Sequence, residues 1–144
     1  MGLGITHGTF EAGYGAFMVF REALARAAGW RVVGQYEYEM GFDVPDELIE
    51  RCAFGELTRE EFPYDPLVVL ICHYDSDGVI TASMVGPLAD RIEALLPALN
   101  DATRQFAPKW AEPTDDDRST MKMAVQFIKG LREAHAAGEG VEFR

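Results

Sequence analysis

The stretch "CHYDSDGVI" carries the side chains that are best suited to chemistry. His73, Asp75 and Asp77 are spaced two residues apart, and Gly78 follows the second carboxylate. Imidazole nitrogens and carboxylate oxygens bind divalent ions such as Mn²⁺ and Mg²⁺, and a glycine lets the backbone reverse so that such ligands face one point. The spacing therefore predicts a divalent metal site made of His73, Asp75 and Asp77. The alternative is a polar turn, in which an aspartate before a glycine only shapes the backbone.

A second histidine stands in a comparable place. His7 follows a short segment predicted to be a strand, residues 3–6, and precedes the Gly-rich turn "HGTFEAGYG". If the strands before the two histidines are parallel neighbours, both histidines lie at the carboxyl edge of the sheet, where open α/β folds bind ligands. We therefore predict a ligand pocket at this edge, with His7, Glu11, Tyr14 and His73 as its ligand-binding residues. The alternative for each histidine is a hydrogen bond to a backbone carbonyl at a strand end.

Apolar periodicity predicts the elements that must position these side chains. Apolar residues at three- and four-residue steps predict helices over about 14–28, 87–96 and 117–137. The run "LVVLIC" in residues 67–73 has no alternation, which is typical of a strand covered on both faces. The predicted fold class is thus α/β or α+β, a single domain over 1–144 in which these helices pack on a small mixed sheet around a central buried strand.

The middle of the chain is strongly acidic. The formal net charge is −11, and the stretch from Glu37 to Asp77 holds twelve acidic residues against Arg51 and Arg59. With only three lysines, the chain has too few cations for phosphate contacts, so we expect no nucleic-acid binding. The acidic segment 37–65 predicts either a solvated face or a surface that meets a basic partner or mimics DNA.

Two local patterns refine this middle part. Residues 45–54 predict a short helix, and Thr58 with Glu61 matches a T-x-x-E capping box. Cys52 and Cys72 form no C-x-x-C pair, so we expect them to be reduced, buried thiols.

Hydropathy and composition give expectations about location and assembly. No apolar run approaches the roughly 18 to 20 residues needed to span a bilayer, and the first residues do not resemble a secretion signal. We expect a cytoplasmic protein without membrane contact. A homodimer is an expected arrangement, because a domain of this size with edge strands, Trp30 and Trp110 often buries aromatic side chains between copies.

The stretch "LVVLICHYDSDGVITAS" resembles the first motif of the DHH phosphoesterase family, in which a buried strand delivers an H-x-D-x-D-G turn whose aspartates hold manganese for phosphodiester hydrolysis. The resemblance covers residues 67–85 and implies that Asp75 and Asp77 are metal ligands with His73 beside them. The family also has a downstream Asp-His-His signature, which this sequence lacks.

The segments "ITHGTF", "GYGAF", "REALA", "GPLADRIEALLP" and "QFIKGLREAHAAGEGVEF" resemble a family of short acidic proteins of actinobacteria and their phages that has no assigned activity. The resemblance extends over most of the chain and implies a shared fold and pocket. The acidic segment 37–65 resembles an insert relative to typical members.

Together these patterns predict a small soluble non-catalytic binding protein rather than an enzyme. Its partner is expected to be a protein at the acidic segment, or a small molecule or divalent metal (Mn or Mg) at the His7 and His73 edge. The alternative is a minimal metal-dependent phosphoester hydrolase that uses the H-x-D-x-D-G turn.

Overall fold

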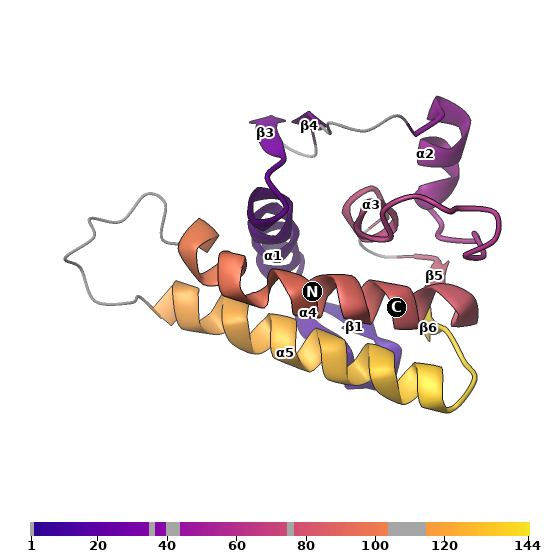
Figure 1. Cartoon of the computed structure of the whole chain (residues 1–144). Helices are drawn as coiled ribbons and strands as arrows, with labels where there is room; N and C mark the ends of the chain where they lie inside the picture. Colours follow the sequence, from indigo (N-terminus) through magenta and orange to yellow (C-terminus); the bar gives the residue numbers. More distant parts are fainter. Residues whose placement is uncertain (1, 35–36, 40–43, 75–76, 104–114) are drawn as a thin grey trace.

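The protein has a mixed α+β fold, which confirms the predicted class (Figure 1). The computed structural model describes residues 2–34, 37–39, 44–74, 77–103 and 115–144. The helices are α1 (Tyr14–Ala27), α2 (Asp46–Cys52), α3 (Leu67–Ile71), α4 (Ala82–Thr103) and α5 (Asp115–Ala136), with a short 3₁₀ turn, η1 (Thr6–Gly8). The strands are β1 (Gly2–Ile5), β2 (Phe10–Gly13), β3 (Arg31–Gly34), β4 (Glu37–Glu39), β5 (Val79–Ile80) and β6 (Val141–Glu142).

Three of the helices form the main body of the molecule. Figure 1 shows α4 and α5 side by side, and α1 packs against both. The helices predicted over 14–28, 87–96 and 117–137 correspond to α1, α4 and α5. However, α4 begins before Pro87 and continues beyond Pro97. Buried apolar side chains on both sides of these prolines, from Met84 to Leu99, hold α4 against its neighbours, and this packing outweighs the hydrogen bonds that the prolines remove.

The strands within the described residues form three antiparallel pairs, β1 with β2, β3 with β4 and β5 with β6. Two of these pairs are linked through the end of the chain. Gly4 and Arg144 exchange both backbone hydrogen bonds, and Ile5 bridges Phe143. The β1–β2 and β5–β6 pairs are therefore joined side by side, and this arrangement replaces the mixed sheet that the sequence predicts.

The central buried strand predicted over 67–73 is wrong, because residues 67–71 form α3. Asp65 and Pro66 set up its first turn: the Asp65 side chain accepts the backbone N–H of Leu67, and the Pro66 carbonyl accepts that of Val69. All five α3 residues are buried. An apolar run without alternation is expected of any segment that is covered all round, so the pattern does not separate a buried helix from a buried strand.

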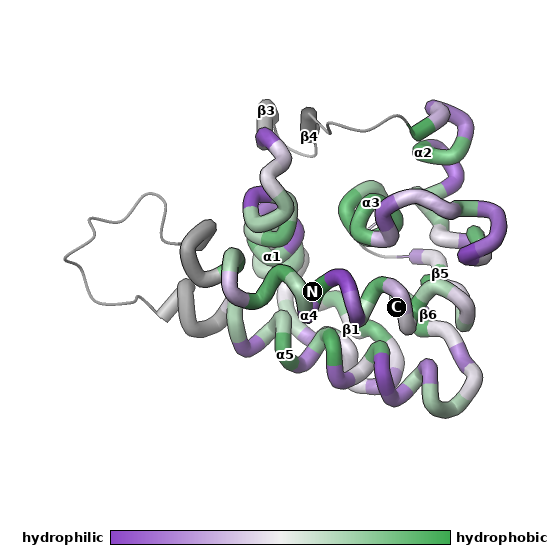
Figure 2. The backbone as a smooth tube through the Cα atoms, in the orientation of Figure 1, coloured by the Kyte–Doolittle hydropathy of each residue, from purple (hydrophilic) through white to green (hydrophobic). Residues whose placement is uncertain are grey.

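One hydrophobic cluster includes residues of β1, β2, β5, β6 and of all five α-helices. Within it, Phe10, Phe17, Phe20 and Phe127 pack together, with neighbouring ring centroids 5.0 to 6.5 Å apart. Figure 2 shows α3 as a hydrophobic segment, whereas α2 carries hydrophilic residues beside it. In the described part of the chain, no helix combines the length and the apolar character needed to cross a membrane.

Candidate functional site

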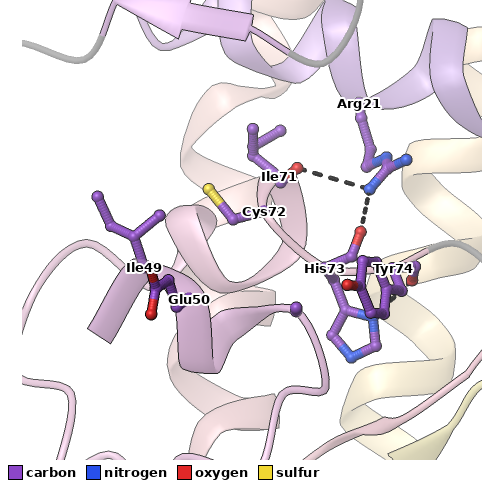
Figure 3. Close-up of a pocket in the computed structure, with 8 residues that line it drawn as sticks. Arg21, Ile49, Glu50, Ile71, Cys72, His73 and Tyr74 are labelled. Atoms are coloured by element: carbon purple, nitrogen blue, oxygen red, sulfur yellow. Dashed lines mark hydrogen bonds between the residues drawn. The ribbon is translucent and has the colours of Figure 1, made fainter. Parts of the chain in front are cut away.

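A pocket of about 650 Å³ lies between α2 and the end of α3 (Figure 3). Ile49, Glu50 and Ala53 line one side, and their spacing of three and four residues places them on one face of α2. The end of α3 and the residues directly after it form the opposite side. The Tyr74 N–H donates to the Ala53 carbonyl at 2.8 Å, which joins the two walls. The lining is mainly apolar and consists of Arg21, Ile49, Glu50, Ala53, Ile71, Cys72, His73 and Tyr74.

Arg21 of α1 caps the end of α3 inside this pocket. Its side chain is only 3% exposed, and Nη1 donates to the carbonyls of His73 at 2.5 Å and of Ile71 at 3.5 Å. The guanidinium also lies over the ring of Phe17, 4.5 Å from its centroid. The last carbonyls of a helix lack intrahelical donors and carry negative partial charge, so a buried cation is stabilised there.

Sequence reasoning did not identify Arg21, although a signal was present. Arg21 is four residues after Phe17 and three before Leu24, which places it on the buried face of α1. An arginine on an otherwise apolar helix face requires a buried polar partner. The position of Arg21 in the sequence therefore pointed to a carbonyl or carboxylate in the core, without showing which one.

His73 closes the loop that follows α3. Its side chain is buried, with Nδ1 2.6 Å from the Tyr74 carbonyl oxygen and Nε2 2.9 Å from the Val79 carbonyl oxygen. Burial lowers the pKa of His73 below its usual value; the two carbonyl contacts oppose this shift, and the charge of Arg21 adds to it. A neutral imidazole has one N–H, so it donates to one of these two carbonyls, and the ring lies between the two ends of the loop from Tyr74 to Val79.

This geometry differs from the one that a metal-binding histidine needs. Such a histidine presents the lone pair of one ring nitrogen to the ion, whereas both nitrogens of His73 face carbonyl oxygens. Asp77 is exposed and its carboxylate accepts the N–H of Gly78 at 2.8 Å, as expected of a turn. Asp75 lies outside the described residues. Among the residues that the structure describes, no group of three or more His, Cys, Asp or Glu side chains is placed to hold a metal ion.

His7 lies elsewhere, in a second pocket of about 550 Å³ beside β5 and β6. Its Nε2 is 3.3 Å from a carboxylate oxygen of Glu139. The two pockets share no lining residue. The prediction that His7 and His73 converge on one pocket is therefore wrong. The physical reason is that β1 turns back into the antiparallel strand β2 and that α3 replaces the second strand, so there is no common carboxyl edge.

Of the other two predicted ligand-binding residues, only Glu11 can be placed relative to the pockets. Glu11 is exposed on β2, opposite Gly4, and lines neither of them. Tyr14 begins α1, and its side chain lies outside the part of the chain that is described.

The cysteines are free thiols with raised pKa values. Burial raises the pKa of Cys52 to about 12 and that of Cys72 to about 11. Both thiols are therefore protonated near neutral pH, and a protonated thiol is a poor nucleophile. Both thiols are free, as the sequence predicts, but only Cys52 is buried, whereas Cys72 is partly exposed and lines the first pocket.

Comparisons of the chain with protein-family models, with curated proteins and with solved structures return no match. The resemblances to the DHH phosphoesterases and to the short acidic actinobacterial proteins thus stay predictions.

Proposed function

We propose that this chain is a non-catalytic binding protein whose ligand site is the pocket between α2 and the end of α3. The observation that carries this proposal is the pocket itself, about 650 Å³ with a mainly apolar lining. Binding sites for small molecules span about 300 to 1,000 Å³ and combine apolar walls with a few polar groups. The pocket has this composition, because Ile49, Ala53 and Ile71 line it together with Arg21 and Glu50.

The polar groups of the pocket favour binding over catalysis. Arg21 donates to the carbonyls that end α3, and both nitrogens of His73 face carbonyl oxygens. Cys72 has a pKa of about 11. General acid–base or nucleophilic catalysis needs a group that can reach the substrate in the correct protonation state. Arg21 and His73 instead hold the pocket walls in place, and no described residue favours the phosphoester hydrolase alternative.

The apolar fluorophore Prodan tests this proposal, because it is uncharged and its emission shifts to the blue when it leaves water. We expect saturable, one-to-one binding to the wild type with a blue shift. Replacing Ala53, which is half-buried in the pocket wall, fills the site in the variant Ala53→Trp and should abolish the shift. Val125→Trp is the matched control, because it adds the same side chain at an exposed position of α5.

Folding must be separated from binding in this experiment. Circular dichroism and thermal unfolding establish whether Ala53→Trp is folded. Tyr74→Ala serves as a second pocket variant, since Tyr74 is 53% exposed and its truncation leaves the core intact. Prodan binding that is equal in the wild type and in both folded pocket variants would rule out this pocket as the site.

A further inference from the structure

Two large aromatic side chains are exposed beside the pocket. Phe54 is 47% exposed and Tyr74 is 53% exposed, and their rings meet edge to face with centroids 5.0 Å apart. Phe54 follows α2 and Tyr74 follows α3, so the pair extends both walls of the pocket onto the surface. Exposed aromatic side chains next to an apolar pocket are typical of protein interaction sites.

The α2 side of this surface is acidic. Asp46, Glu47 and Glu50 are all exposed, and none of them makes a salt bridge with a described residue. Arg51, the basic residue of α2, is held by Glu61 at 3.0 Å. On the pocket side, Asp46 is three residues before Ile49 and four before Glu50, so it shares their helix face.

The position of Glu50 has no explanation in helix stability. Asp46 and Glu47 lie in the first turn of α2, where negative charge stabilises a helix. Glu50 lies in the last turn, where a carboxylate faces the negative end of the helix dipole and is unfavourable. It nevertheless lines the pocket. A residue that costs stability at the mouth of a pocket is expected where it contacts a ligand.

We infer that the occupant of this pocket is an apolar side chain of a basic segment of a protein partner, with a lysine or arginine next to that side chain paired to Glu50. This inference rests on the proposed function of the pocket and names its partner. The apolar walls take the anchoring side chain, and the acidic face of α2 attracts the flanking cations. The Phe54 and Tyr74 rings offer further contacts to the cations through their faces.

Three short dye-labelled peptides test the inference by fluorescence anisotropy. The first contains lysine and serine with one central leucine, the second replaces lysine by glutamate, and the third replaces leucine by serine. We expect only the first peptide to bind measurably at low ionic strength and its affinity to fall as salt is raised, because salt screens exposed charges. This peptide should also displace Prodan from the wild type.

Two variants test whether Glu50 recognises the positive charge of the basic peptide. Glu50→Gln should weaken binding of the basic peptide by about fivefold, the upper range for one exposed ion pair. The same change should leave the thermal stability equal or higher, because it removes a carboxylate from the end of α2. Glu133→Gln is the matched control, since Glu133 is an exposed glutamate in the last turn of α5, and it should leave the affinity unchanged.

The outcomes separate this inference from the proposed function. If Prodan binds in the pocket but the lysine and glutamate peptides bind equally, or if Glu50→Gln keeps full affinity, the pocket serves a different ligand and the inference is overturned. If Prodan binding is insensitive to Ala53→Trp, the proposed function itself fails, whatever the peptides do.

Discussion

The imidazole of His73 stacks on the ring of Phe143, with 4.0 Å between centroids and 18° between the ring planes. His73 follows α3, whereas Phe143 follows β6 and donates its backbone N–H to the Gly78 carbonyl at 2.9 Å. The contact therefore joins the loop after α3 to the end of the chain. The histidine that the sequence marks as a metal ligand is thus placed at a structural junction.

His73→Ala should lower the free energy of unfolding by about 2 to 4 kcal/mol, because it removes a buried ring and the N–H that this ring donates to a backbone carbonyl. Urea unfolding measures the effect. His135→Ala is the control, since His135 is exposed on α5, and it should change stability by less than about 0.5 kcal/mol. Equal stability of His73→Ala and wild type would show that His73 does not stabilise the contact between the loop after α3 and the end of the chain.

Gly55 should not tolerate a side chain. Its φ is +69°, and a Cβ atom there would lie 1.7 Å from the Val79 carbonyl oxygen and 2.6 Å from Nε2 of His73. Gly29, with φ +84°, has open space instead. Gly29→Ala should cost about 1 to 2 kcal/mol from backbone strain alone, and Gly55→Ala should cost clearly more, since the clash is added to the strain. Equal losses in urea unfolding would show that the surroundings of Gly55 yield to the new methyl group.

Glu61 should give a pH-dependent contribution to stability. The capping box predicted from the sequence is confirmed: the Glu61 carboxylate accepts the backbone N–H of Thr58 at 3.1 Å, and the Thr58 hydroxyl accepts the backbone N–H of Glu61 at 3.2 Å. The Thr58 backbone bond, followed by the hydrogen bond from Arg51, lowers the pKa of Glu61. A lowered pKa in the folded state means that the contribution is complete above the ordinary value of 4.5 and disappears as the pH falls through the folded-state pKa.

The variant Glu61→Gln reveals this contribution. Its melting temperature should lie below that of the wild type near neutral pH, and the difference should shrink as the pH falls below 4.5. A difference that is constant from neutral to acid pH would mean that the charge of Glu61 is not involved.

The local patterns of the sequence predicted the long helices and the capping box, but they did not predict the tertiary arrangement. The long helices and the Thr58 capping box depend on periodicity and on contacts within a few residues, which the sequence displays directly. The run in residues 67–71 is buried all round, and neither its helical form nor its start at Asp65 and Pro66 follows from apolar character.

The predicted location of the functional site depended on the strand predicted over residues 67–73. Reading 67–73 as a strand placed His7 and His73 at a common sheet edge, whereas α3 and the β1–β2 hairpin place them in separate pockets. Arg21, which caps α3, acts on a segment about fifty residues later in the chain. A contact of this kind depends on how the helices pack, and a single sequence carries no direct record of it.

Divalent metals should not stabilise this protein through the H-x-D-x-D-G turn. Mn²⁺ binding by His73 would require one ring nitrogen to leave its carbonyl partner and the buried ring to turn. We therefore expect no rise in melting temperature with Mn²⁺ or Mg²⁺. A metal-dependent rise that is present in the wild type and in Glu133→Gln but lost in Asp77→Asn would establish the metal site that the sequence predicts.

Arg21 should stabilise the fold through the end of α3. In Arg21→Leu the carbonyls of Ile71 and His73 lose a buried charged donor, which should lower the free energy of unfolding by about 2 to 4 kcal/mol. Arg21→Lys keeps the charge but not the planar fork of donors, so it should recover only part of this loss. Urea unfolding measures both variants, and the matched control is Arg26→Leu, a less buried arginine on the same helix. Buried charges can sometimes be replaced by apolar side chains without loss. An Arg21→Leu variant as stable as the wild type would therefore show that the carbonyls of Ile71 and His73 need no cation.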